Sequence, residues 1–361
     1  MRLSSRSARA WDWVVLAAAA SLALFGGLAM CSATSAVHPE LALRHATWIG
    51  LGMLLSFAVA RVSPHRWMDA AGAAYGLILS ALALVLVAGT VRLGASRWLS
   101  VFGLSVQPAE FMKLATIALL ARYLAGQPRP LPGRAVWGSL LVAAPPALLI
   151  FLQPDLGTAS IFGAIWVGMV WVAGASRRLL LGMAASFLAL LPIGWHLLHD
   201  YQRDRLLVFI NPHVDPLGAG YTIIQSTIAI GSGRWLGRGW FAGTQNQLSF
   251  LPERHSDFLF SVIGEEWGFA GAAAVVALFG LLLGRALRLA RELSDPQGRL
   301  LLAGMGAWLG YQVFVNIGMV MGLVPVVGVP LPLLSYGGSS MLTVWTALGL
   351  LQALRRSEAA W

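Results

Sequence analysis

Residues 248–268 read LSFLPERHSDFLFSVIGEEWG, a loop turned by Pro252 that runs into an apolar helix at about Phe258. The stretch concentrates ionisable side chains in a chain that has few of them elsewhere: Glu253, Arg254, His255, Asp257, Glu265 and Glu266. Ionisable groups at a boundary between water and membrane are costly to place and are functional candidates by default. Asp257, at the entry to the helix, is therefore the first candidate for chemistry.

The composition predicts that the solvent of this chain is lipid. Of its 361 residues, 58% are hydrophobic and 11% are charged, whereas a soluble domain averages about 25% charged residues. The net charge of +10 does not indicate a nucleic-acid partner, because the arginines form short clusters between apolar runs and follow no single polar face. Cys31 is the only cysteine, which excludes an intrachain disulfide and a cysteine metal cluster.

Apolar segments long enough to cross a bilayer recur along the whole chain. A spanning helix needs about 20 apolar residues, and the first such run is interpreted as a retained helix because no small-residue cleavage site stands out. We expect an all-α polytopic membrane protein with a single domain over residues 1–361. Its ten predicted spans are 13–30, 41–60, 70–89, 108–125, 135–152, 156–173, 179–198, 258–284, 300–324 and 336–354.

The distribution of arginine predicts the orientation. Ten spans place both termini on one side, and the connections on that side contain twice as many arginines as the others. Cytoplasmic connections are the ones enriched in basic residues. We therefore expect both termini in the cytoplasm and Asp257 on the outer side.

Two outer connections are predicted to be ordered. The large loop 199–257, between predicted spans seven and eight, contains apolar runs and aromatic residues that a disordered segment lacks. Within it, Tyr221–Ile230 is too short to span and is predicted to be a re-entrant or interfacial helix. The loop 90–107 carries Arg97 and Trp98 and is predicted to form a small hairpin.

Asp257 has two possible roles. The helix N-terminus and nearby Arg254 favour its ionised form, whereas partial burial opposes ionisation. An ionised carboxylate at the membrane surface can act as a general base, which contributes roughly 10²- to 10⁴-fold in rate. The same pattern fits a helix N-cap equally well, and the two roles are compatible.

Two further motifs place charges at predicted helix starts. In QPAEFMKLA, residues 107–115, Glu110 and Lys113 are three residues apart and share a helix face. A structural ion pair and a substrate contact fit this pair equally well. In QPDLGTA, residues 153–159, Asp155 precedes Thr158 by three residues, a spacing that favours helix capping.

Other charged residues allow alternatives. Arg97, Arg203 and Arg205 are suited to phosphate groups, because a guanidinium forks onto phosphate oxygens, but contact with bulk lipid headgroups fits each of them as well. Glu265 and Glu266 fit either a proton path or a structural network. The chain contains no HExxH, GxSxG or GxxxxGK motif, so hydrolase and ATPase functions lack support.

Four motifs together resemble the signatures of the SEDS family, whose members shape, elongate and divide bacterial cells. They are QPAEFMKLA, QPDLGTA, FLPERHSDFLFSVIGEEWGF and NIGMVMGLVPVVGVPLPLLSYGGSSML, the last two at residues 250–269 and 316–342. The resemblance covers nearly the whole chain. Within the family, LPERHSDF and QPD are more similar to the RodA branch than to the FtsW branch.

The resemblance implies a peptidoglycan glycosyltransferase that polymerises lipid II on the outer face of the bacterial cytoplasmic membrane during cell elongation. It implies a class B penicillin-binding protein as partner, which supplies the transpeptidase. The essential aspartate of the family falls on Asp257, and its important glutamate and lysine fall on Glu110 and Lys113. The substrate-contacting positions that we expect in addition are Asp155, Arg97, Arg203, Arg205, Arg254 and His255.

The expected reaction is an inverting attack by an acceptor sugar hydroxyl on the anomeric carbon of a lipid-pyrophosphate sugar, with Asp257 as general base. Apolar grooves between spans would hold the polyprenyl tails among membrane lipids. The resemblance suggests a divalent cation, Mg²⁺ or Mn²⁺, which no motif proves. The alternatives are a lipid II transporter, with its charged span residues along the path, and a non-catalytic scaffold for the penicillin-binding protein.

Overall fold

The computed structural model describes residues 11–35, 38–92, 95–101, 104–198, 200–218 and 220–358. Seven helices in these ranges are long and apolar enough to cross a membrane, which makes the chain a multi-pass membrane protein. They are α2 (Trp13–Thr34), α3 (Glu40–Val59), α4 (Pro64–Ala88), α6 (Gly133–Leu152), α8 (Arg177–Leu197), α13 (Gly268–Glu292) and α14 (Pro296–Val320).

Three more helices cover the remaining predicted spans: α5 (Pro108–Ala125), α7 (Leu156–Val172) and α15 (Gly338–Glu358). Helix α5 contains three charged residues, and α7 is too short to be counted with the seven. The structure thus places a helix on each of the ten predicted segments, while the number of membrane crossings stays a prediction.

The eighth predicted span is two helices, which corrects the single helix expected over 258–284. Helix α12 (Leu259–Glu266) ends at Trp267, and α13 starts at Gly268 with a φ of 63°. A Cβ atom on Gly268 would lie 2.3 Å from the backbone nitrogen of Gly237, so only glycine fits this junction. Helix α13 also continues to Glu292, beyond the predicted end of the span at residue 284, so Arg285 lies on the helix.

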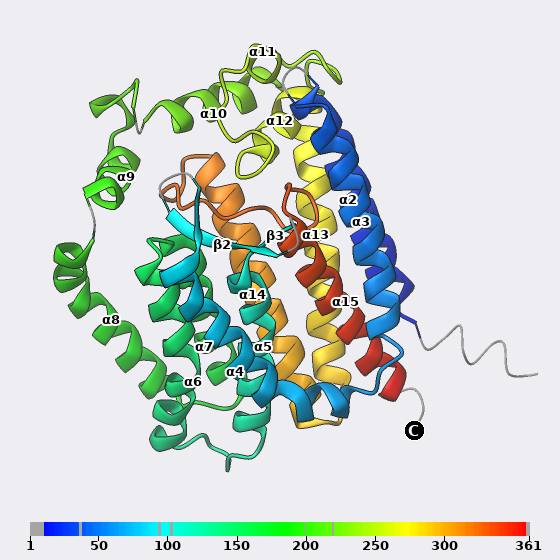
Figure 1. The fold of residues 1–361 in the computed structure, drawn as a ribbon, viewed down its shortest axis with the longest axis vertical. Helices are drawn as coiled ribbons and strands as arrows, with labels where there is room; N and C mark the ends of the chain where they lie inside the picture. Colours follow the sequence, from blue (N-terminus) through cyan, green and yellow to red (C-terminus); the bar gives the residue numbers. More distant parts are fainter. Residues whose placement is uncertain are drawn as a thin grey trace, which may run out of the picture.

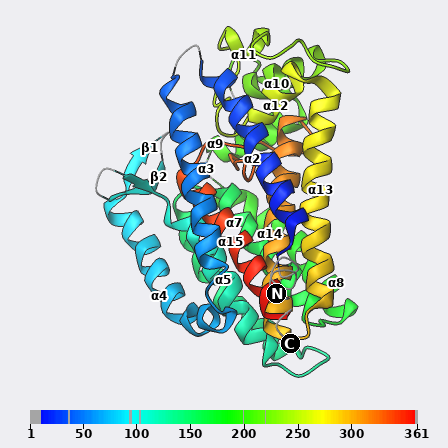
Figure 2. The ribbon, with the colours of Figure 1, turned by 90° about the vertical axis from the view of Figure 1, so that its right-hand side faces the viewer.

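A small sheet is the exception to the all-α prediction. Strands β1 (Thr90–Arg92), β2 (Ala95–Val101) and β3 (Leu104–Val106) form an antiparallel sheet in the order β1-β2-β3. This sheet confirms and extends the hairpin predicted for the loop 90–107. Figure 2 shows β1 and β2 above the end of α4, beside α3.

The long connection before α12 is built of short helices: α9 (Asp200–Ile210), the 3₁₀ helix η1 (Pro212–Val214), α10 (Tyr221–Ser232) and α11 (Thr244–Gln247). Figure 1 shows this connection running from α8 across one end of the bundle towards α2. Helix α10 confirms the short helix expected at Tyr221–Ile230. Helix α2 begins and α15 ends at the opposite end of the bundle (Figures 1 and 2).

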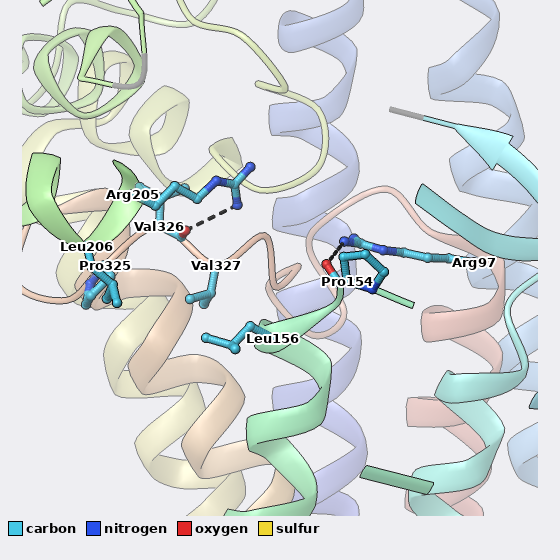
Figure 3. A pocket seen from close by; sticks show the side chains of 8 residues that line it. All are labelled: Arg97, Pro154, Leu156, Arg205, Leu206, Pro325, Val326 and Val327. Carbon is cyan, nitrogen blue, oxygen red and sulfur yellow. Dashed lines mark hydrogen bonds between the residues drawn. The ribbon is translucent and has the colours of Figure 1, made fainter. Parts of the chain in front are cut away.

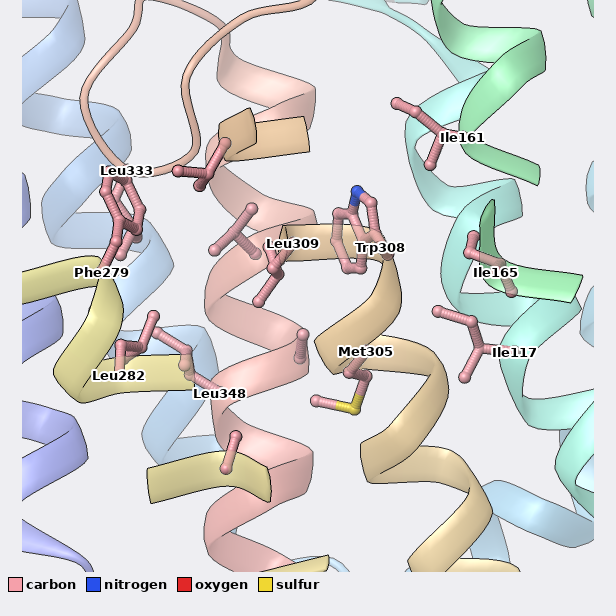
Figure 4. Packing of buried hydrophobic residues seen from close by; sticks show 14 of the residues in the cluster. Ile117, Ile161, Ile165, Phe279, Leu282, Met305, Trp308, Leu309, Leu333 and Leu348 are labelled. Carbon is pink, nitrogen blue, oxygen red and sulfur yellow. The ribbon is translucent and has the colours of Figure 1, made fainter. Parts of the chain in front are cut away.

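Helix α14 is the most buried of the candidate spans, and none of the α8 residues whose burial is described is buried. Met305, Trp308 and Leu309 of α14 pack with side chains from α5, α7, α13 and α15, as Figure 4 shows. In a lipid solvent such packing depends on close contact between helices, because the tails are as apolar as the side chains. The central position of α14 brings its polar residues Gln312 and Asn316 into contact with the segments around Pro330 and Asp257.

Candidate active site

A cavity of about 840 Å³ opens between the sheet, the starts of α5 and α7, and the turns before α12 and α15. Its lining contains most of the predicted site residues. The acidic, basic and histidine side chains that line it are Arg44, Arg97, Glu110, Asp155, Glu253, His255 and Asp257. Residues far apart in the sequence thus meet around one space that is large enough for part of a substrate.

Asp257 lies in the turn that precedes α12 and faces this cavity. The N-cap of α12 is Phe258, and no side chain caps the helix there, so the alternative role of Asp257 as helix cap is wrong. The side-chain amide of Asn316 donates to the Asp257 backbone carbonyl at 2.9 Å. A Cβ atom on Gly328 would lie 3.4 Å from Asp257 Oδ2, which shows how closely that segment approaches the carboxylate.

The surroundings of Asp257 favour its protonated form more than the helix-start argument suggested. Burial raises its pKa to about 7, and the negative charges of Glu253 and Asp155 also raise it, while Arg205 and Arg97 lower it. Desolvation penalises the charged form of a carboxyl group more than the distant arginines favour it. A carboxylate with a pKa near neutrality is well matched to proton transfer at physiological pH.

Asp155 caps α7, as its spacing predicted. Its carboxylate accepts from the backbone nitrogen and from the hydroxyl of Thr158, both at 3.0 Å. Arg97 Nη1 lies 3.5 Å from Asp155 Oδ2, and Arg97 Nη2 donates to the Pro154 carbonyl at 2.6 Å. Arg97 therefore joins strand β2 to the start of α7 at the edge of the cavity.

Glu110 and Lys113 form the ion pair that their spacing predicted. Lys113 Nζ donates to Glu110 Oε1 at 2.8 Å, and both residues are buried. Lys113 also lies 3.4 Å from Gln312 Oε1 and 5.0 Å from the ring centroid of Trp308. Glu110 lines the cavity, and its Oε2 has no hydrogen-bond partner among the described residues. The lysine therefore positions the glutamate at the wall of the cavity, where its second oxygen is shielded from solvent.

The predicted phosphate-binding arginines take different places. Arg205 donates to the Val326 carbonyl at 3.3 Å and, together with Arg97, lines a smaller pocket beside the cavity. Figure 3 shows these two arginines on opposite sides of that pocket, with Leu156 and Val327 between them. Arg203 donates to carbonyls of α8, those of Trp195 at 3.1 Å and His196 at 3.2 Å. The described cavity lining therefore does not include Arg203.

Arg254 and His255 separate although they are adjacent in the sequence. Arg254 is buried, and its guanidinium donates to the Ala33 carbonyl at 2.7 Å, to Ser249 Oγ at 3.0 Å and to the Asn246 carbonyl. Because the carbonyls of α2 and α11 occupy its donors, the substrate contact expected of Arg254 does not appear in the described cavity. His255 does line the cavity, and burial lowers its pKa.

Glu265 and Glu266 belong to a structural network on α12. Glu265 accepts from the backbone nitrogens of Gln245 at 2.9 Å and Asn246 at 3.2 Å. Glu266 accepts from the side-chain amide of Asn246 at 3.0 Å and from the hydroxyl of Ser32. These bonds fasten α11 and the end of α2 to α12, which favours the structural network over the proton path.

Two features of the site had not been expected from the sequence. Arg44 and Trp48 of α3 line the cavity, although neither was predicted to be a site residue. The one available signal was an arginine inside a segment predicted to span the membrane, a costly position. Gln312 and Asn316 of α14 also touch the segments that enclose the site, and they lie in the interior of an otherwise apolar helix.

The chain matches one family of known proteins over nearly its whole length. Residues 10–360 match the family described as cell cycle protein, which groups FtsW, RodA and SpoVE. The chain is 40% identical over 307 residues to the peptidoglycan glycosyltransferase MrdB of Escherichia coli (strain K12), covering 85% of this chain and 83% of MrdB. It is 35% identical over 346 residues to the stage V sporulation protein E of Bacillus subtilis (strain 168), covering 91% and 93%.

Solved structures agree with these matches. One of them is a structure of a peptidoglycan synthase complex that coordinates polymerization and crosslinking. A chain of this complex has a TM-score of 0.84 and 38% identity, and the match covers 96% of this chain and 98% of that one. The crystal structure of the Thermus thermophilus rod shape determining protein RodA gives 0.73 and 34%, covering 96% and 97%. Because these matches extend over nearly the whole chain, it belongs to the FtsW, RodA and SpoVE family.

Proposed function

We propose that this protein is a peptidoglycan glycosyltransferase that joins lipid II into glycan strands at the outer face of the bacterial cytoplasmic membrane, with a part in cell elongation. The observation that carries the proposal is Asp257, a carboxylate with a pKa of about 7 in a cavity of about 840 Å³ at one end of a bundle of apolar helices. Relatives named peptidoglycan glycosyltransferases support it.

In the proposed reaction Asp257 is the general base. An acceptor sugar hydroxyl attacks the anomeric carbon of the donor, and its proton passes to Asp257 Oδ as the new oxygen–carbon bond forms. The bond from the anomeric carbon to the polyprenyl pyrophosphate breaks, and the pyrophosphate leaves with the electron pair. A single base is enough, because pyrophosphate needs no general acid to depart, unlike the leaving group of a glycosidase.

Cations around the cavity are suited to the leaving pyrophosphate. Arg97 and Arg205 approach it from two sides of the smaller pocket, and Arg44 faces the main cavity from α3. Preorganised positive charge lowers the barrier where negative charge develops. Glu110 lines the same cavity, and Lys113 Nζ holds its carboxylate there by a hydrogen bond of 2.8 Å.

In the proposal, a divalent cation would bind only together with the pyrophosphate of the substrate. No group of three or more histidine, cysteine, aspartate or glutamate side chains within the described ranges is arranged to hold a metal ion. The residues present therefore do not form a resident Mg²⁺ or Mn²⁺ site, and no reaction step is assigned to one. If a cation acts, the pyrophosphate oxygens would supply most of its ligands.

The surroundings of the enzyme follow from the same proposal. Its orientation places both termini in the cytoplasm and the cavity outside, with ten membrane crossings. The exposed apolar surface of α8, which includes Leu181, Phe187 and Leu188, would face lipid and polyprenyl tails. A class B penicillin-binding protein would be the transpeptidase partner, supported by the likeness to a chain of a peptidoglycan synthase complex.

The test compares the wild type with Asp257→Ala, each purified with a class B partner, for glycan polymer formed from lipid II on a gel. The matched control is Asp69→Asn, which changes an exposed acid on α4. We expect polymer from the wild type and the control and none from Asp257→Ala. Polymer at the wild-type rate from a folded, partner-bound Asp257→Ala would overturn the role of Asp257.

The two alternatives make different predictions. A lipid II transporter would move lipid II across vesicles while polymerisation is blocked, but the charged residues that favoured it are paired or tied into a network. A non-catalytic scaffold would keep partner binding and cell-shape function in Asp257 variants. Vesicle flipping and complementation of cell shape therefore separate these functions from the polymerase.

A further inference from the structure

Helix α14 carries a line of polar side chains through the middle of the bundle. Trp308, Gln312 and Asn316 follow at intervals of four residues, so they lie along one face of the helix. All three are fully buried. Amides inside a membrane bundle are costly unless they are hydrogen-bonded, and they are retained where they have a task.

Asn316 joins two segments that enclose the cavity. Its Nδ2 donates to the backbone carbonyl of Asp257 at 2.9 Å and to that of Val329 at 2.7 Å. One NH₂ group thus uses both of its hydrogens to hold the turn before α12 against the segment between α14 and α15. These two contacts fix the backbone of Asp257 relative to the residues that face its carboxylate.

The segment held by Asn316 covers the carboxylate. Gly328, next to Val329, has a φ of 68°, and a Cβ atom built on it would lie 3.4 Å from Asp257 Oδ2. Gly328 and Pro330 both line the cavity beside Asp257. A displacement of this segment would open the carboxylate to water on that side.

Gln312, one turn away, extends the connection to the other carboxylate of the site. Its Nε2 donates to the Pro330 carbonyl at 2.7 Å, and its Oε1 accepts from Trp308 Nε1 at 2.6 Å and from Lys113 Nζ at 3.4 Å. Lys113 in turn holds Glu110. Two amides on one face of α14 therefore hold the short segment Gly328–Pro330. The same two amides connect it to Asp257 and, through Lys113, to Glu110.

We propose that Asn316 is a positioning residue for Asp257, and that Gln312 links the same segment to the Glu110–Lys113 pair. The expected loss of polymerisation rate rests on the proposed function. The hydrogen bonds by which Asn316 positions Asp257 do not depend on it. Asn316 touches only backbone carbonyls of the site, so it acts through Asp257 and not on substrate.

The proposal predicts a change in the titration of Asp257. The charged groups that act on it are Glu253, Asp155, Arg205 and Arg97, and α14 contributes none of them. Burial is the largest cause of its raised pKa. Without Asn316 the Gly328 segment is released, water reaches the carboxylate, and the pKa falls towards its ordinary value.

The experiment uses Asn316→Leu, which has a similar shape and no amide, in the full-length chain with its class B partner. The matched control is Gln352→Leu, because Gln352 is also a buried amide that bridges backbone groups, here the nitrogen and carbonyl of Asp12 at the far end of the bundle. Two quantities are measured against pH: the rate of lipid II polymerisation, and the labelling of Asp257 by dicyclohexylcarbodiimide, which reacts with protonated carboxyl groups.

We expect Asn316→Leu to lower the polymerisation rate by about 10²-fold, as misplaced catalytic groups do, and to move both the acid limb of the rate and the labelling midpoint to lower pH. Gln352→Leu should keep the wild-type limb and midpoint. If the labelling midpoint of Asn316→Leu equals that of the wild type, the proposal is wrong. The labelling tests the positioning role of Asn316 even if neither the wild type nor any variant polymerises lipid II. That second result would overturn only the proposed function. Asn316→Ser replaces Asn316→Leu if the latter does not fold.

Discussion

Arg97 Nη1 and Asp155 Oδ2 form an ion pair of 3.5 Å that ties the small sheet to the start of α7 at the edge of the cavity. Arg97 adds hydrogen bonds to the carbonyls of Pro154 at 2.6 Å and Gln153 at 3.4 Å. The guanidinium thus fixes the QPD turn, whose aspartate caps α7 and adds to the field at Asp257. Arg97 therefore links the small sheet to Asp155, and both charges act on the pKa of the proposed base, Asp257.

Replacement of this guanidinium by an amine tests the connection. Arg97→Lys keeps the charge but loses the fork that reaches Asp155 and Pro154 together. We expect the polymerisation rate to fall by about tenfold to a hundredfold, the range for hydrogen bonds to charged groups. Arg238→Lys is the control, because Arg238 lies in the connection between α10 and α11 and its bonds run to Ser232 and Thr244. Equal rates for Arg97→Lys and the wild type would contradict the connection.

The raised pKa of Asp257 predicts opposite pH trends for rate and stability. A general base must be deprotonated, so the rate should rise as the pH increases through about 7. The folded protein binds more protons than the unfolded chain between pH 3.8 and about 7, so the stability contribution of this group is complete below that window and is lost as the pH rises through it.

Asp257→Asn should therefore raise the apparent Tm at pH 8 relative to the wild type and leave the difference small near pH 4. Thermal unfolding of the purified protein followed by intrinsic tryptophan fluorescence measures this. Asp69→Asn, at an exposed position, should show no such pH dependence. A Tm of Asp257→Asn that stays below the wild type at pH 8 would mean that burial does not disfavour the charged carboxylate.

Local patterns in the sequence predicted local structure well. The Asp155–Thr158 cap, the Glu110–Lys113 pair and the short helix α10 all depend on residues within a few positions of each other. The apolar segments also located the helices, because a helix in lipid satisfies all its backbone hydrogen bonds within one segment. Contacts between residues three or four positions apart on one helix can therefore be predicted from the sequence alone.

Contacts across long sequence separations could not be predicted in this way. The sequence predicts Arg254 beside Asp257, whereas its guanidinium donates to the Ala33 carbonyl at the end of α2. The break at Trp267 depends on the approach of Gly237 to Gly268, which no helical pattern encodes. Asn316 had no signal beyond being an amide in an apolar helix, because its partners come from two separate loops.

The buried ion pair makes a stability prediction. Lys113→Met leaves the Glu110 carboxylate buried without its partner, and breaking such a pair costs about 3–5 kcal/mol. The double variant Glu110→Gln/Lys113→Met should recover most of this loss, because no unpaired charge remains, but it should stay inactive. The control is Glu292→Gln, which breaks a half-exposed pair with Arg355 worth about 0–1 kcal/mol. A double variant less stable than Lys113→Met would contradict this account.

The hydrogen bonds of Glu265 predict a local effect on the connection that contains α11. Glu265→Gln weakens the bonds to the backbone nitrogens of Gln245 and Asn246, and an imperfectly satisfied buried group costs about 1–3 kcal/mol. Hydrogen exchange of residues 233–250 should therefore become faster, while exchange in α14 stays the same. Glu358→Gln serves as control, because Glu358 also accepts from a backbone nitrogen, that of Ser294. Unchanged exchange in 233–250 would show that α11 does not depend on this carboxylate.

Gly328 and Gly322 form a natural pair for separating strain from proximity to Asp257. Both have positive φ, 68° and 72°, so alanine at either position costs about 1–2 kcal/mol of backbone strain. A Cβ atom at Gly328 would lie 3.4 Å from Asp257 Oδ2, whereas at Gly322 it would meet side chains of α10, with Ile223 nearest at 3.6 Å. Gly328→Ala and Gly322→Ala should therefore lower the Tm by similar amounts. Only Gly328→Ala should also lower the polymerisation rate, because its methyl group enters the space beside the carboxylate. Equal rates for the two variants would show that the approach of this segment to Asp257 has no part in the reaction.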